Sequence, residues 1–209
     1  RAMQTGGTGG KCLVLHDDQE QTVADVSSRW VTLPNALSLL RLALAPVVVW
    51  LVLSGSVAAL GLALVLMVIA ELTDFFDGYL ARALRQESEI GRLIDPVCDV
   101  IYHVSVFLAF VKQGWMAPWM LFVIYARDLG VPYVRTLARQ RGVDIGVRYS
   151  GKVKTGVHGV AQITVVLVAL GYVSQTFLGF ETTFMVLLAA TIVSLISLAD
   201  YTMAAFAPQ

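Results

Sequence analysis

Residues 74–99 read DFFDGYLARALRQESEIGRLIDPVCD, and this charged stretch lies between two long apolar runs. A helix needs about 20 mostly apolar residues to cross a bilayer. The flanking sequence satisfies this requirement on both sides, and predicts membrane helices over residues 57–81 and 93–111. Acidic and basic side chains are therefore expected where these two helices meet the membrane surface.

Composition extends this interpretation to the whole chain. Of 209 residues, 57% are hydrophobic and 14% are charged, with a mean hydropathy of +0.72. A soluble domain carries about 25% charged residues. These values exclude a soluble enzyme, a disulfide scaffold and a disordered regulator. Lys plus Arg and Asp plus Glu both total 15, so the balance of charge gives no reason to expect a nucleic-acid partner.

The predicted fold is an all-α integral membrane protein with six transmembrane helices. The expected spans are residues 36–53, 57–81, 93–111, 116–138, 156–175 and 181–206. Most Lys and Arg residues fall on one side of this arrangement, so the positive-inside rule places both termini in the cytoplasm. A flexible tail (1–18) and a short interfacial helix (19–31) are expected to precede the membrane domain (32–209).

Four aspartates of the opening stretch fall on two helical stripes. Asp74 and Asp77 lie on one stripe, and Asp95 and Asp99 lie on the other at i, i+4 spacing. Carboxylates inside a membrane are costly and mark functional sites by default. Two Mg²⁺ or Mn²⁺ ions would balance four such charges, because hard cations prefer oxygen ligands. The nearby Arg82 offers a bidentate donor for phosphate oxygens.

Two alternatives to a pyrophosphate-binding metal site are open at this point. The acids could form a structural ion network with Arg82, Arg85 and Arg92. They could also line a cation pathway, as in a transporter.

The stretch resembles the signature of the CDP-alcohol phosphotransferase family, D-x2-D-G-x2-A-R-x8-G-x3-D-x3-D, at every fixed position. The resemblance implies that Asp74, Asp77, Asp95 and Asp99 bind two metal ions, and that Asp99 also deprotonates the acceptor hydroxyl. The CDP-diacylglycerol ligand would be held by Gly78, Ala81, Arg82 and Gly91. Asn35, at the start of the first span, either faces this ligand or caps the boundary of the span. The family also implies a homodimer, with its active site facing the cytoplasm.

Basic residues further along the chain bear on the acceptor. Tyr-Ala-Arg127-Asp128 and the segment from Gly151 to Thr155, GKVKT, resemble segments of phosphatidylglycerophosphate synthases in this family. The basic residues Arg127, Arg135, Lys152 and Lys154 would suit a phosphate dianion, and glycerol 3-phosphate is the expected acceptor. Alternatively, the two lysines anchor the chain to anionic lipid.

Several assignments stay open on the sequence alone. Val100 stands where phosphatidylglycerophosphate synthases usually carry Lys, so inositol phosphate, another sugar phosphate or phosphatidylglycerol are alternative acceptors. Arg41 either faces the nucleotide or extends to the membrane surface. Asp200 is a candidate partner for Arg127, and His103 is either a neighbour of the metal site or a packed core residue. No role follows for Glu71.

Overall fold

The protein is described here from a computed structural model. The structure describes residues 33–84, 91–143, 145–146, 148–177 and 179–206, without the side chains of residues 33–35, 74–84 and 91–94. The expected N-terminal tail (1–18) and interfacial helix (19–31) lie outside the described residues. Both assignments therefore stay predictions.

The described part of the chain is helical except for one small hairpin. The helices are α2 (Leu33–Ser54), α3 (Val57–Leu84), α4 (Gly91–Lys112), α5 (Pro118–Gln140), α6 (Tyr149–Ala169) and α7 (Thr182–Phe206). The hairpin pairs β1 (Thr176–Phe177) with β2 (Phe180–Glu181) in antiparallel register. The predicted all-α class is confirmed, and five of the six expected spans agree with a helix to within three residues at each end.

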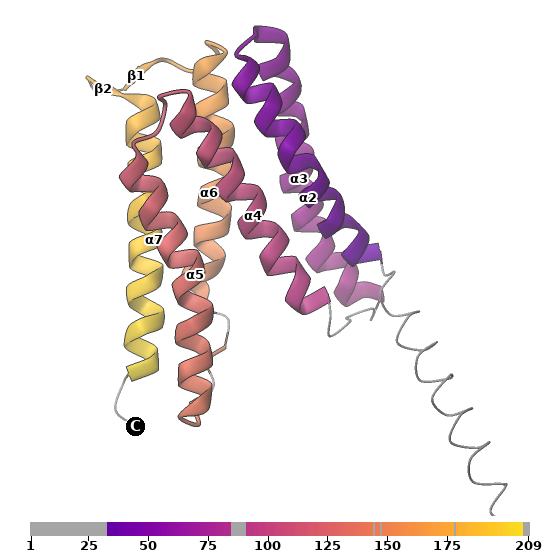
Figure 1. Cartoon of the computed structure of the whole chain (residues 1–209), viewed down its shortest axis with the longest axis vertical. Coiled ribbons are helices and arrows are strands. Elements are labelled where there is room, and N and C mark those ends of the chain that lie inside the picture. The colour runs from indigo at the N-terminus through magenta and orange to yellow at the C-terminus, as the bar shows by residue number, and fades with distance from the viewer. Residues whose placement is uncertain (1–32, 85–90, 144, 147, 178, 207–209) are drawn as a thin grey trace, which may run out of the picture.

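The helices run alternately up and down in one bundle (Figure 1). Tight turns at one end join α2 to α3 and α4 to α5, and Gly55 and Gly114 adopt positive φ angles of 68° and 77° there. Such angles suit glycine, which has no Cβ to clash. The other end carries the start of α2, the α3–α4 and α5–α6 connections and the end of α7 (Figure 1). We call it the polar end.

Helix α2 packs against both α3 and α4, while α7 packs against α5 and α6. Helix α6 also contacts α3 and α4, and so joins the two halves of the bundle. Large apolar side chains fill the interior, including Phe107, Phe110, Met120, Ile124 and Leu187. This packing places the start of α2 against the start of α4 at the polar end, with α6 in contact with α4.

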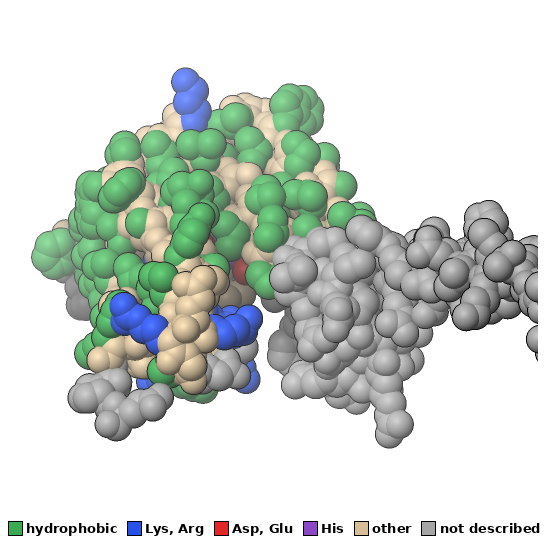
Figure 2. Space-filling model, turned by 60° about the horizontal axis from the view of Figure 1, so that its bottom comes forward, with side chains coloured by type: hydrophobic (Ala, Val, Ile, Leu, Met, Phe, Trp, Pro, Cys, Tyr) green, Lys and Arg blue, Asp and Glu red, His purple; other side chains and the backbone are tan. Residues whose placement is uncertain are grey.

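The outer surface is rich in exposed apolar side chains. Figure 2 shows hydrophobic side chains over much of the visible face, with Lys and Arg gathered towards the polar end. Within the described residues, Ala36–Ser54 and Thr182–Phe206 are long and apolar enough to cross a membrane, by length and composition. These two helices support a membrane protein. Helices α4, α5 and α6 are less apolar because they carry most of the charged residues considered below.

One predicted boundary is wrong. The fifth span was expected at residues 156–175, but α6 covers Tyr149–Ala169. The helix ends early because Gly171, with φ at 81°, forms a turn that leads into the hairpin. It also begins earlier, so the GKVKT segment lies within the first turns of α6 rather than in a connecting loop.

Candidate active site

The two halves of the charged stretch lie on consecutive helices at the polar end of the bundle. The backbone of α3 passes through residues 74–84, and α4 begins at Gly91. The side chains of one set of predicted site residues lie outside the described residues: Asn35, Asp74, Asp77, Gly78, Ala81, Arg82 and Gly91. Their assigned roles stay predictions, and the described part of the site consists of Asp95, Asp99 and their neighbours.

Asp95 and Asp99 lie one turn apart on α4 and meet polar residues of α2. The Ser38 hydroxyl donates a hydrogen bond of 2.6 Å to Asp95 Oδ1. Arg41 Nη1 lies 3.9 Å from Asp99 Oδ1, and the Arg41 side chain is only 4% exposed. Arg41 is thus held inside the bundle beside a carboxylate, so the alternative in which it extends to the membrane surface is wrong.

His103, one turn beyond Asp99, joins three helices. Its Nε2 lies 3.1 Å from Asp99 Oδ1 and 3.9 Å from Oε1 of Glu71 on α3. Its Nδ1 lies 3.0 Å from Oε1 of Gln162 on α6, and Gln162 Nε2 donates a hydrogen bond to the His103 carbonyl oxygen. His103 is therefore a neighbour of the predicted metal ligands as well as a buried residue.

The Glu71 carboxylate lies directly against the backbone of α6. A Cβ atom added at Gly159 would overlap the Glu71 carboxylate. Since a larger residue at position 159 would make the Glu71 side chain shift, this glycine leaves room for the carboxylate beside His103.

Arg127 and Lys154 converge on a buried carboxylate. Arg127 Nη1 donates to Asp128 Oδ1 at 3.0 Å, and Lys154 Nζ donates to Asp128 Oδ2 at 3.0 Å. The Asp128 and Lys154 side chains are 0% and 2% exposed. Arg127 Nη2 also donates to the Ser197 hydroxyl on α7 at 2.8 Å. Two of the four predicted acceptor-binding cations therefore lie together, sharing one counter-charge.

The other two predicted cations lie apart from that pair. Arg135 Nε donates to the carbonyl oxygen of Ile145, and Lys152 is exposed at the start of α6. Neither makes an ion pair with a carboxylate in the described part of the chain.

The suggested pairing of Asp200 with Arg127 is wrong. Asp200 Oδ2 accepts hydrogen bonds from Arg148 Nε at 2.7 Å and from the Ser150 hydroxyl at 2.6 Å. The bond to Asp200 raises the pKa of Arg148 above its ordinary value. The backbone N–H of Arg148 donates to the Tyr201 hydroxyl. These contacts fasten the start of α6, just before Lys152, to α7.

A model of CDP-alcohol phosphatidyltransferases matches residues 31–199. The chain belongs to this family. It is 36% identical over 129 residues to a protein of Mycobacterium tuberculosis named as a candidate cardiolipin synthase, covering 61% of each chain. It is 31% identical over 137 residues to a cardiolipin synthase (CMP-forming) of Streptomyces coelicolor, covering 64% of this chain and 61% of that one.

A third relative carries a different name. A CDP-diacylglycerol–glycerol-3-phosphate 3-phosphatidyltransferase of Cereibacter sphaeroides is 34% identical over 134 residues, covering 62% of this chain and 61% of that one. The chain thus spans about three fifths of the length of the curated relatives it matches.

Family membership implies a divalent metal, and the described donors fit one. Asp95 and Asp99 present carboxylate oxygens from adjacent turns, which suits a hard cation. Asp99 Oδ1 is buried and accepts no hydrogen bond from the described residues. No group of three possible metal ligands occurs among the side chains that the structure describes, because the predicted set also requires Asp74 and Asp77.

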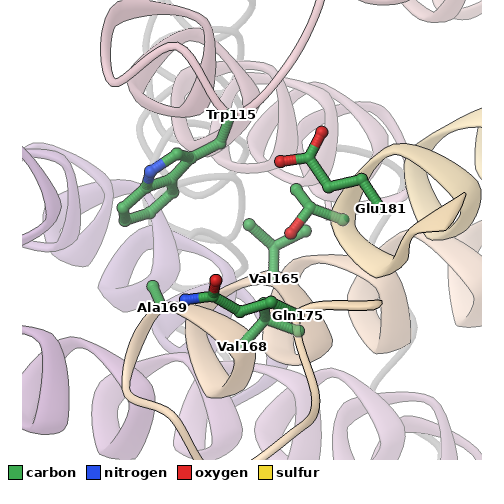
Figure 3. A pocket seen from close by; sticks show the side chains of 7 residues that line it. Trp115, Val165, Val168, Ala169, Gln175 and Glu181 are labelled. Carbon is green, nitrogen blue, oxygen red and sulfur yellow. The ribbon is translucent and has the colours of Figure 1, made fainter. Parts of the chain in front are cut away.

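A cavity of about 160 Å³ lies at the opposite end of the bundle from these aspartates. Trp115, Gln175 and Glu181 line it together with aliphatic side chains of α6 (Figure 3). None of the predicted site residues borders it, so the cavity is separate from the candidate active site.

Three residues that make contacts in the candidate site had no role predicted from the sequence: Glu71, Asp128 and Gln162. Asp128 follows Arg127 directly, and its burial could have been suspected from the cost of a carboxylate within a membrane helix. Gln162 is an uncharged residue 59 positions away from His103. No local pattern indicates that contact.

Proposed function

We propose that this chain transfers a phosphatidyl group from CDP-diacylglycerol to the hydroxyl of glycerol 3-phosphate and releases CMP. The observation that carries the proposal is the placement of Asp99 beside Arg41, His103 and Lys154 at the polar end. Arg41 and His103 contact Asp99, and Lys154 also interacts with it electrostatically. Asp99, the proposed base for the acceptor hydroxyl, is therefore near Lys154, a proposed ligand of the acceptor phosphate.

On the nucleotide side, Asp74, Asp77, Asp95 and Asp99 would hold two Mg²⁺ or Mn²⁺ ions. Bound divalent ions would stabilise the charge that develops on the phosphate oxygens. Arg82 would bind the diphosphate of the CDP moiety, and Asn35 would also contact this ligand. The small residues Gly78, Ala81 and Gly91 would let the ligand approach the backbone closely.

In the reaction, the acceptor hydroxyl oxygen forms a bond to the lipid-bearing phosphorus. The bond from that phosphorus to the bridging oxygen of CMP breaks, and CMP leaves with its electron pair. Asp99 accepts the hydroxyl proton as a general base, a role worth about 10²–10⁴ in rate. Ser38 keeps Asp95 oriented on the same helix face by its hydrogen bond.

On the acceptor side, Arg127, Arg135, Lys152 and Lys154 would bind the phosphate. Arg127 and Lys154 share the single charge of Asp128, which leaves one positive charge in excess in this buried cluster. A phosphate dianion would be attracted to it, and charge-assisted hydrogen bonds to such an anion are strong. Lys152 is exposed at the start of α6, two residues before the buried Lys154.

A second acceptor is favoured by a specific observation. The relatives from Streptomyces coelicolor and Mycobacterium tuberculosis carry cardiolipin synthase names. Val100 also departs from the usual Lys of phosphatidylglycerophosphate synthases. Phosphatidylglycerol is therefore the alternative acceptor, and it would give cardiolipin by the same chemistry.

For the membrane arrangement, we propose six spans with the polar end in the cytoplasm and a homodimeric assembly. The up-and-down order of the helices supports the first part, because it brings the start of α2 and the end of α7 to the same end (Figure 1). Exposed cations at that end, Arg139, Arg141, Arg148 and Lys152, agree with the positive-inside rule.

The test is CMP release by the purified protein from CDP-diacylglycerol and Mg²⁺, with each candidate acceptor in turn. We expect glycerol 3-phosphate to support turnover and free glycerol to be poor. Asp99→Asn should lower the rate about 10²–10⁴-fold. Activity with phosphatidylglycerol alone would favour the cardiolipin alternative. Absence of CMP release with every acceptor would favour a non-catalytic cation-binding transporter.

A further inference from the structure

The cavity at the end of the bundle opposite the aspartates has an aromatic side, an acidic side and aliphatic side chains between them. Trp115 comes from the turn between α4 and α5, and Glu181 comes from β2, directly before α7. These two side chains lie on opposite sides of the cavity, with Val165 between them in the view (Figure 3). An aromatic ring and a carboxylate therefore border the same small space.

Both sides of the cavity are held in place by contacts within the protein. The Trp115 ring packs against the Phe110 ring with 5.7 Å between centroids, and the Trp115 N–H donates to the Phe110 carbonyl oxygen at 2.9 Å. On the other side, the N–H of Thr182 donates to the Gln175 carbonyl oxygen at 2.9 Å, which holds the neighbouring Glu181 beside Gln175. The cavity is thus formed before any ligand binds, and preorganisation of this kind lowers the cost of binding.

Glu181 has no cationic partner among the residues that the structure describes. The connecting segments at this end, residues 54–56, 112–117 and 170–181, contain two charged residues, Lys112 and Glu181. Lys112 does not line the cavity. A carboxylate at the edge of a cavity, with no described cation beside it, suits a ligand that carries a positive charge.

The size and lining of the cavity favour a methylated ammonium group. A cavity of roughly 150 Å³ holds a molecule the size of benzene, and this one measures about 160 Å³. A quaternary ammonium group, with about five heavy atoms, fits such a space. Its methyl groups suit the aliphatic side chains of Val165 and Val168, and its charge suits the face of a Trp ring. A primary ammonium is more strongly hydrated, and valine side chains do not replace its water.

We propose that this cavity binds a quaternary ammonium group, held between the Trp115 ring and the Glu181 carboxylate. The group belongs either to a free choline-like cation or to the head group of a choline lipid. Exposed aromatic side chains of the adjacent hairpin, Phe177 and Phe180, suit the headgroup level of a membrane. The inference is independent of the proposed function, because no predicted site residue borders the cavity.

The test is ¹⁹F NMR of the full chain labelled with 5-fluorotryptophan, in a maltoside detergent and without CDP-diacylglycerol. The chain has four tryptophans, and the resonance lost in Trp115→Phe assigns the signal. Choline chloride is titrated against two controls: its uncharged isostere 3,3-dimethylbutan-1-ol, and NaCl at equal ionic strength. We expect choline alone to shift the Trp115 resonance saturably, with a Kd of about 1–10 mM for so small a ligand.

Three variants separate charge, space and general electrostatics. Glu181→Gln keeps the side-chain shape without the charge, and should raise the Kd about threefold or more. Ala169→Leu narrows the cavity while keeping Glu181, and should weaken binding to a similar extent. Lys112→Gln is the matched control, because it removes the other charge at this end without touching the cavity. Its Kd should stay within about twofold of the parent value.

Nanodiscs distinguish the two sources of the ammonium group. In phosphatidylglycerol discs, added choline should shift the Trp115 resonance. In phosphatidylcholine discs, a resonance already at the shifted position would identify the lipid head group as the ligand. A normal response to added choline in those discs would identify the free cation.

Three results would overturn the inference. They are a Trp115 resonance that does not respond to choline in detergent, an equal shift with the uncharged isostere, and a Glu181→Gln variant that binds choline as tightly as the parent. Failure of the proposed function would look different, because CMP release is no part of these measurements.

Discussion

Gly156 and Gly159 lie on the same helix, one turn apart, and alanine is expected to stabilise the protein more at position 156 than at position 159. A Cβ at Gly156 would have no atom within 4 Å apart from its own helix. Alanine in a helix interior is more favourable than glycine by about 0.5–1 kcal/mol. Gly156→Ala should therefore raise the thermal midpoint, by about 1–4 °C for a chain of this size.

Gly159→Ala shares this gain but adds a steric cost. The new Cβ would overlap the Glu71 carboxylate, which is 24% exposed and lies 3.9 Å from His103. Because the overlapping atoms are the far end of a flexible side chain, the carboxylate can turn aside, and the cost lies at the low end of overpacking, at about 1 kcal/mol. Since the helix-forming gain is common to both variants, their midpoints should differ by the steric cost alone, or about 2–4 °C.

Thermal unfolding in detergent, followed by tryptophan fluorescence, measures both midpoints. Glu71→Ala should remove the difference when it is combined with each glycine variant, because the displaced carboxylate is then absent. Equal midpoints for Gly156→Ala and Gly159→Ala would show that the Glu71 carboxylate does not lie against Gly159 as described. A difference that persists without Glu71 would show that another contact is responsible.

Three further predictions concern the charged residues. Asp74→Ala should abolish Mg²⁺-dependent thermal stabilisation, and a normal Mg²⁺ response would remove this residue from the metal site. Lys152→Gln should raise the acceptor KM about tenfold while the KM for CDP-diacylglycerol stays constant, and an unchanged acceptor KM would assign the lysine to membrane anchoring. Asp128→Asn should cost about 3–5 kcal/mol in an unfolding assay, because the buried Lys154 and the part-buried Arg127 lose their counter-charge. Lys154→Met should cost less, since Arg127 still neutralises Asp128, and the reverse order would contradict the described pairing.

The helices themselves could be predicted from sequence because each is a long apolar run between turn residues. The signature also placed Asp95 and Asp99 on one face of α4, since i, i+4 spacing fixes that relation without any tertiary information. Both predictions depend only on local pattern.

The two wrong predictions, for the start of α6 and for the partner of Asp200, concern contacts between residues far apart in the sequence. The start of α6 was expected to be a loop because its sequence, YSGKVKTG, is polar and glycine-rich. It is helical in the bundle, where Lys154 is neutralised by Asp128, 26 residues earlier, and Ser150 bonds Asp200 on α7. Asp200 was likewise assigned the wrong arginine, since Arg127 is satisfied by Asp128 and Ser197. No single-helix pattern contains these relations.

The pairing of Arg127 with its neighbour Asp128 has a consequence for biosynthesis. Both residues belong to α5, so this helix leaves the ribosome with its buried positive charge already balanced. Lys154 follows on α6, and a buried lysine without a counter-charge is costly to insert into a bilayer. That cost falls if α5 is already in the bilayer with the Asp128 carboxylate available to Lys154. Because α5 is synthesised before α6, the Asp128 carboxylate is in place before Lys154 needs a counter-charge. We therefore expect α5 to assist the insertion of α6.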